Sequence, residues 1–222
     1  MDADAYAAAG FPAPPRPWFA WVGALLIAAA IGAVAADIIA ISQREGASFL
    51  ATSVSATAVG ATAWFVDAAI YLTAAAIAAL AFALHHWHLD HGRYRFGIFC
   101  LGGLSISMFL LAGWSAYDPD QVPDFGFHMM QVYALSAFFP LAALTLARAL
   151  TKVHARWGVF SVCLAALWMI SGPIYAVTPE DWEGLFQRIA FVMMLIWLAG
   201  LGVVLIGAAV RARRVDPTAE GA

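Results

Sequence analysis

Charged residues are scarce in this chain of 222 amino acids. Lys, Arg, Asp and Glu together make up 11% of the residues, whereas hydrophobic residues make up 64% and the mean hydropathy is +0.82. An ordinary soluble domain carries about 25% charged and about 45–50% apolar residues. So little charge could not keep the surface of a folded chain hydrated, which excludes an ordinary soluble protein. The composition indicates a protein that folds in a lipid bilayer.

Two other residue types are missing where particular sites would need them. The only cysteines, Cys100 and Cys163, fall inside apolar stretches, where packed thiols are expected rather than a disulfide. None of the six histidines lies near the middle of an apolar stretch. A haem buried in a membrane usually takes axial histidines from the spanning helices, so an intramembrane cytochrome is disfavoured. The only cofactor that the sequence leaves open is a divalent metal.

What the chain has in abundance is apolar sequence of membrane-spanning length. A helix needs about 20 apolar residues to cross a hydrocarbon core of ~30 Å. Six stretches meet this length, so the expected fold class is all-α, a polytopic membrane bundle of six transmembrane helices. The stretches are Trp18–Ile41, Ala61–Leu84, Phe96–Tyr117, Met129–Leu150, Trp157–Thr178 and Ile189–Val210.

The second stretch requires a break before it. From Ala47 to Leu84 the only charged residue is Asp67. A single helix over that distance would be roughly 57 Å long, which far exceeds the thickness of the hydrocarbon core. We therefore expect a break near Gly60, with Ser48–Val59 as an interfacial or re-entrant segment.

The domain organisation follows from these spans. Residues 1–17 are rich in Ala and Pro and are expected to form a disordered tail, 18–210 the transmembrane domain, and 211–222 a cytoplasmic C-terminal tail. The first span is not expected to be a cleaved signal peptide, because Asp2 and Asp4 stand where such a peptide carries basic residues.

Basic residues gather on one side of the predicted membrane. Nine of the eleven share one side, namely Arg16, Arg93, Arg95, Arg148, Lys152, Arg156, Arg211, Arg213 and Arg214, while Arg44 and Arg188 lie on the other. Short cytoplasmic loops carry an excess of Lys and Arg. We therefore predict a multi-pass protein of the bacterial inner membrane with both termini in the cytoplasm. The net charge of −3 gives no reason to expect a nucleic-acid partner.

Ionisable residues inside the spans are candidates for function, because a charged group in a membrane is costly. Asp37 lies about one turn from the outer end of the first span, and Asp67 lies about two turns inside the second. Tyr71 follows Asp67 by four residues, which places it on the same helical face. The loop after the third span adds Asp118 and His128 (Gln131 follows by three residues).

These residues predict a ligand-binding pocket that faces outward. The predicted ligand-binding residues are Asp37, Asp67, Tyr71, Asp118, His128 and Gln131. Carboxylates with one histidine can hold a divalent cation, relay protons, or bind a cationic or hydroxylated head group. Solvated loop acids and helix caps would explain part of the same pattern without any ligand.

A second cluster lies at the cytoplasmic end of the second span. His85, His88 and His91 are three residues apart, so on a continuous helix they would be neighbours and could chelate Zn²⁺ or Cu²⁺. A helix C-terminus also favours partly protonated histidines without any metal. Elsewhere, Pro140 and the sequence Ser171-Gly172-Pro173 could kink the fourth and fifth spans and expose carbonyl groups to a cavity, although Gly and Pro are common in membrane helices.

Several short motifs resemble a known family. They are the serine-rich stretch Ser48–Ser55, Gly60-Ala-Thr-Ala-Trp64-Phe-Val-Asp67, Ala-Gly-Trp-Ser-Ala-Tyr-Asp118-Pro119, His128, and Phe139-Pro140-Leu-Ala. On these the chain resembles the bacterial domain-of-unknown-function family 998, a six-helix membrane group similar to the DRAM-like and Sfk-like superfamily. The resemblance covers about residues 18–210. It implies an outer site at Asp67, Asp118 and His128 and supplies no activity, while the link of the wider superfamily to membrane lipid organisation suggests lipid handling by analogy.

Three functions fit the sequence. The first is an inner-membrane protein that binds or moves a lipid or small polar ligand, with Asp67 as the buried anchor and Asp118 and His128 at the mouth of the pocket. The second is an accessory subunit packed against a larger membrane complex, which short loops and abundant small residues also suit. The third is a membrane-embedded metal-dependent hydrolase, which ranks lowest because His128 is the only histidine on the outer side.

Overall fold

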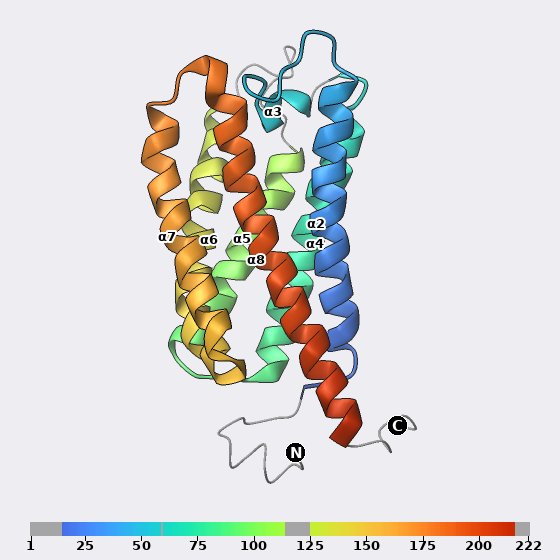
Figure 1. The fold of residues 1–222 in the computed structure, drawn as a ribbon, viewed down its shortest axis with the longest axis vertical. Helices are drawn as coiled ribbons and strands as arrows, with labels where there is room; N and C mark the ends of the chain where they lie inside the picture. The colour runs from blue at the N-terminus through green and yellow to red at the C-terminus, as the bar shows by residue number, and fades with distance from the viewer. Residues whose placement is uncertain (1–14, 59, 114–124, 216–222) are drawn as a thin grey trace.

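The computed structural model describes residues 15–58, 60–113 and 125–215 (Figure 1). These residues form seven helices and no strand. The helices are α2 (Phe19–Ser42), α3 (Val54–Thr57), α4 (Ala63–Trp87), α5 (Arg93–Gly113), α6 (Phe125–Val153), α7 (Ala155–Ala176) and α8 (Glu180–Val215).

Six of these helices are long and apolar enough to cross a bilayer, as the sequence predicts. The exception is α3, a helix of four residues between α2 and α4. The predicted break near Gly60 is also confirmed, since Gly60 adopts φ +88°, a left-handed conformation that glycine adopts at little cost. Both α6 and α7 continue through their internal prolines, Pro140 and Pro173.

The six long helices form a closed ring in chain order. Each packs on its neighbours in sequence, and α2 also packs on α8, so the first and last helices complete the ring. The contact between α7 and α8 is the least extensive of the six helix–helix contacts in the ring. The helices alternate in direction, and α3 lies at the top of Figure 1. We call this the α3 end of the bundle, and the end where α4 meets α5 and α6 meets α7 the opposite end.

Two glycines bring α2 and α8 into backbone contact. A Cβ atom on Gly23 would lie 2.5 Å from the carbonyl oxygen of Gly202, and one on Gly202 would lie 2.6 Å from that of Gly23. Small residues let membrane helices approach this closely, because no side chain separates the backbones. This contact closes the ring toward the opposite end of the bundle.

The last helix is longer than the sequence predicts. It begins at Glu180 instead of Ile189 and continues to Val215, beyond the boundary expected at Val210. Its first turn carries Glu180 and Asp181, whose negative charge suits the N-terminus of a helix. Arg188 lies inside the helix because its charge is neutralised within the bundle, as described below.

Candidate functional site

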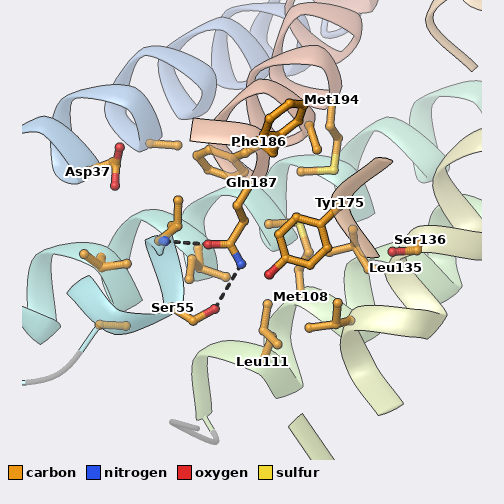
Figure 2. A pocket seen from close by; sticks show the side chains of 18 of the residues that line it. Asp37, Ser55, Met108, Leu111, Leu135, Ser136, Tyr175, Phe186, Gln187 and Met194 are labelled. Atoms are coloured by element: carbon orange, nitrogen blue, oxygen red, sulfur yellow. Dashed lines mark hydrogen bonds between the residues drawn. The ribbon is translucent and has the colours of Figure 1, made fainter. Parts of the chain in front are cut away.

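A cavity of about 320 Å³ lies within the ring toward its α3 end (Figure 2). All six long helices contribute to its wall, and the segment that contains α3 covers part of it. Figure 2 shows Gln187 extending from α8 toward Ser55, with Tyr175 of α7 beside it. The cavity therefore occupies the centre of the bundle at the end where the sequence predicts a pocket.

The lining changes from polar to apolar along the bundle axis. Near the α3 end it includes Asp37, Asp67 and His128, each within about two turns of a helix end. Farther in it includes Trp168 and Met194. The indole nitrogen of Trp168 donates to the carbonyl of Ser136 at 3.1 Å, so this ring presents an apolar surface to the cavity.

Asp37 is paired within the bundle. Arg188 donates from Nε to Oδ2 at 2.7 Å and from Nη2 to Oδ1 at 2.9 Å, and both side chains are about nine-tenths buried. Such a two-point contact is the strongest form of an arginine–carboxylate pair. The pairing neutralises Asp37, so this predicted ligand residue contributes to the wall with its charge already satisfied.

The same arginine holds the segment that covers the cavity, residues 48–58, which we call the cap segment. Arg188 Nη1 donates to the carbonyls of Phe49 at 3.1 Å and Thr52 at 2.6 Å. Gln187 accepts from the amide of Val54 at 2.5 Å. The amide of Leu185 donates to the carbonyl of Leu50 at 2.9 Å. Three residues near the start of α8 therefore bind the cap segment, Leu185 through its backbone and Gln187 and Arg188 through their side chains.

Asp67 differs from Asp37 in having no partner among the residues that the structure describes. It lines the cavity from α4 and is half-buried. It makes no hydrogen bond or ion pair with any residue in the part of the chain that the structure describes. A carboxyl group at this depth without a partner is costly, which makes it the natural contact for a bound molecule.

The structure brings only part of the predicted site together. Asp37, Asp67 and His128 line the cavity, and His128 is buried. Gln131 is buried but does not line it. Tyr71 does not line it either, because its ring packs edge-on against Phe109 of α5 at 5.0 Å. Asp118 lies outside the residues that the structure describes.

Sequence reasoning missed several polar residues of the wall. Ser55, Gln187 and Tyr175 line the cavity, and Arg188 braces it. The hydropathy pattern assigns Gln187 and Arg188 to a loop, because polar and charged residues are typical of the loops between spans. Helix α7 continues through the sequence Ser171-Gly172-Pro173, where a kink is expected, and Ser171 and Gly172 belong to the lining.

The histidine cluster at the opposite end does not have the predicted helical geometry. Helix α4 ends at Trp87, and His88 caps it with a left-handed backbone at φ +51°. The chain therefore leaves the helix before His91, and the expectation that His88 and His91 share a helical face is wrong. The rings of His85 and His88 lie 5.6 Å apart. Within the described residues, no three His, Cys, Asp or Glu side chains gather as a metal site requires.

A surface ion pair stabilises the corner beside these histidines. Asp90 lies 3.4 Å from Lys152 Nζ and 4.0 Å from Arg148 Nε, both of α6. Lys152 also donates to the carbonyl of Leu89 at 3.0 Å. A hydrogen bond from the His91 amide lowers the pKa of Asp90, desolvation opposes this shift, and the charges of Lys152 and Arg148 add to it.

A family model described as a protein of unknown function, DUF998, matches residues 27–204. The chain belongs to the DUF998 family. The match runs from α2 to the second half of α8 and includes every cavity residue from Ala33 to Met194, which confirms the resemblance drawn from the short motifs. No curated protein and no solved structure matches the chain. The function of this DUF998 protein must therefore be argued from the cavity itself.

Proposed function

We propose that this DUF998 protein binds one amphipathic ligand, a lipid or a small polar molecule with an apolar part, in the cavity at the α3 end. The volume of about 320 Å³ is within the range of small-molecule sites, about 300–1,000 Å³. The lining offers polar groups at the α3 end and apolar side chains farther in, where Trp168 and Met194 form what we call the apolar floor. The observation that carries the proposal is the carboxyl of Asp67 in the wall of this cavity, which has no partner among the described residues.

The distribution of basic residues supports an outward-facing site. The ends of α6 and α8 at the opposite end, and the starts of α5 and α7, carry the predicted cytoplasmic Lys and Arg residues. At the α3 end lie Arg44 and the neutralised Arg188. By the positive-inside rule, the α3 end faces the outside of the inner membrane and both termini face the cytoplasm.

The contrast between the two acids indicates the chemistry of the ligand. Asp37 already accepts two hydrogen bonds from Arg188, whereas Asp67 accepts none from a described residue. A ligand group that is positively charged or donates hydrogen bonds would satisfy Asp67 and recover the cost of placing the acid there. His128, Ser55 and Gln187 supply further polar contacts around the same end of the cavity.

The substitution Asp67→Asn tests this proposal. It keeps the size of the side chain and removes its charge, so we expect about a tenfold loss of bound ligand, the value of one charge-assisted hydrogen bond. Native mass spectrometry of the gently solubilised protein measures the species that remain bound. The matched control is Asp181→Asn, an exposed acid in the first turn of α8.

The unfolding temperatures of the two variants show whether a loss of bound ligand reflects the site or a loss of folded protein. Asp67→Asn should unfold at or above the wild-type temperature, because Asp67 has no partner among the described residues whose loss would destabilise the bundle. Asp181→Asn should lose only the small favourable interaction of its charge with the N-terminus of α8. A wild-type protein without any bound small molecule, or equal retention by Asp67→Asn, would contradict the proposal. A partner chain present in a fixed ratio in wild type and variant alike would instead favour the accessory-subunit hypothesis.

A further inference from the structure

We propose that the ligand is a lipid that enters the cavity sideways from the bilayer, through a window between α7 and α8 in their α3-end halves. One acyl chain would pass the window and reach the apolar floor, while the head group stays near Asp67. This inference rests on the proposed function, and it adds the class of ligand and the route by which it arrives.

The exposed part of the lining identifies the window. Among the described residues that line the cavity, only Met169, Gly172 and Tyr175 are exposed, and all three belong to α7. Met169 exposes 59% of its surface and Tyr175 exposes 36%. The lining residues on the other helices and on the cap segment are buried or half-buried. Within the described chain, α7 is therefore the part of the wall whose lining residues reach both the cavity and the outer surface.

Two contacts between α7 and α8 bound the window. At the deep side, the indole nitrogen of Trp197 donates to Ser161 Oγ at 2.9 Å. At the α3 end, the Tyr175 hydroxyl donates to Glu183 Oε1 at 2.6 Å. Glu183, Ala190 and Trp197 are seven residues apart, close to two helical turns, so they share one face of α8. Ala190 therefore lies on the face that meets α7, halfway between the two contacts.

Small residues leave space on both sides of this window. Ala190 lines the cavity from α8, and Gly172 lines it from α7. A Cβ atom placed on Gly172 would meet no atom within 4 Å. Larger side chains on facing helices would fill this space, so the gap is a direct consequence of these two residues.

The helix beside the window is weakly held. Pro173 has no amide hydrogen, so the carbonyl of Met169 loses its partner one turn later in α7. Every residue from Gly172 to Val177 is exposed, which means that this part of α7 makes few contacts with the bundle. Bending of α7 there would widen the window at little cost, since few buried contacts would be lost.

The surroundings of the window favour a lipid over a water-borne ligand. Exposed apolar side chains flank it on α7, among them Ile170 and Ile174, as expected for a surface that contacts acyl chains. From the α3 end, a ligand would have to pass the cap segment, which Arg188 and Gln187 bind to α8. A lipid in the outer leaflet reaches Met169 and Gly172 without displacing that segment.

Adjacent residues on α7 provide a matched test. Met169 and Ile170 are both 59% exposed, but only Met169 lines the cavity. We expect Met169→Trp to block the window and Ile170→Trp to leave it open, because the same large ring points to the cavity in one case and to the membrane in the other. Ala190→Leu closes the window from α8 and serves as a second blocking variant.

The measurement uses proteoliposomes that contain phosphatidylethanolamine with a photoreactive group at the end of one acyl chain. Illumination after increasing delays, followed by peptide mass spectrometry, reports labelling of the floor at Trp168 and Met194. We expect floor labelling in wild type and Ile170→Trp, and loss or strong slowing of it in Met169→Trp and Ala190→Leu. Labelling of the membrane face of α5 at Phe99 checks that all proteins meet the probe equally.

The two possible failures are distinguishable. If the wild-type floor takes up no label, the cavity does not bind this lipid and the inference of a lipid ligand fails, whereas the proposed function fails only if native mass spectrometry finds no bound small molecule in the wild-type protein. If the wild-type floor is labelled and both blocking variants load as fast as Ile170→Trp, the cavity binds lipid but the window is not its route. If one blocking variant unfolds at a lower temperature than wild type, the result of the other blocking variant decides, since the two substitutions lie on different helices.

Discussion

The two ends of the bundle each carry an acid paired with basic residues, but in opposite settings. Asp37 and Arg188 expose about a tenth of their side chains, whereas Asp90, Lys152 and Arg148 expose 24%, 35% and 79%. Toward the opposite end, large side chains such as Phe19, Leu84 and Trp87 fill the interior of the ring. Toward the α3 end, the interior holds the cavity. The interior of one half of the bundle is filled by side chains, whereas the other half holds a cavity with a buried ion pair at its wall.

The largest effect should follow from breaking the buried pair with Arg188→Ala. Asp37 would remain buried without its partner, and the cap segment would lose two carbonyl contacts. Loss of one member of a buried pair costs about 3–5 kcal/mol. Thermal unfolding of the purified protein in detergent should show this loss, together with faster proteolysis of the cap segment.

A paired substitution separates the charge from the contacts to the cap. In Asp37→Leu/Arg188→Met no buried charge remains, so stability should partly recover while proteolysis of the cap segment stays fast. An Arg188→Ala variant that unfolds at the wild-type temperature would mean that the stability of the half that holds the cavity does not depend on this pair.

The second largest effect should follow from a change in the half of the bundle toward the opposite end, where side chains fill the interior. Gly23→Val would force α2 and α8 apart, because the first side-chain atom already meets the Gly202 carbonyl at 2.5 Å. Overpacking of this kind costs about 1–3 kcal/mol. The matched control on the same helix is Gly32→Val, where an added Cβ meets nothing within 4 Å. Equal unfolding temperatures for the two variants would contradict close packing of α2 on α8.

The smallest effect should come from the exposed pair. The folded-state pKa of Asp90 is lowered, so its contribution to stability is present above the unfolded value of about 4 and is lost as the pH falls through the folded value. Asp90→Asn should therefore lower stability at pH 7 by less than about 1 kcal/mol and remove that part of the acid dependence. Unfolding temperatures of variant and wild type should converge once the pH lies below the lowered folded-state pKa of Asp90.

The sequence predicts the elements of this fold better than it predicts the partners of individual side chains. Six apolar stretches appear as six long helices, because length and hydropathy depend on local sequence alone. The shared location of Asp37, Asp67 and His128 also follows from topology, since each lies near a helix end on the same side. The pairing of Asp37 with Arg188 spans 151 positions of the chain and has no local signal.

The errors have equally specific causes. A hydropathy reading ends a span at charged residues, so it placed the start of α8 nine residues too late, at Ile189 instead of Glu180. The spacing of the histidines predicts a continuous helix, but the backbone of His88 adopts a left-handed conformation. No glycine stands at this position to indicate in the sequence that the helix ends there. Tyr71 shares a helix with Asp67, yet the 40° rotation between residues four apart directs it to Phe109 instead of the cavity.

Closure of the ring by α2 and α8 has a consequence for biogenesis. The ribosome delivers α8 after the other five long helices, so the face of α2 that bears Gly23 has no permanent neighbour until α8 has been made. Arrival of α8 then supplies Arg188 to Asp37 and Gln187 to the cap segment in a single step. Until that step a nascent chain holds five inserted helices around an unfinished compartment, with an unneutralised acid as a mark that quality-control machinery could detect.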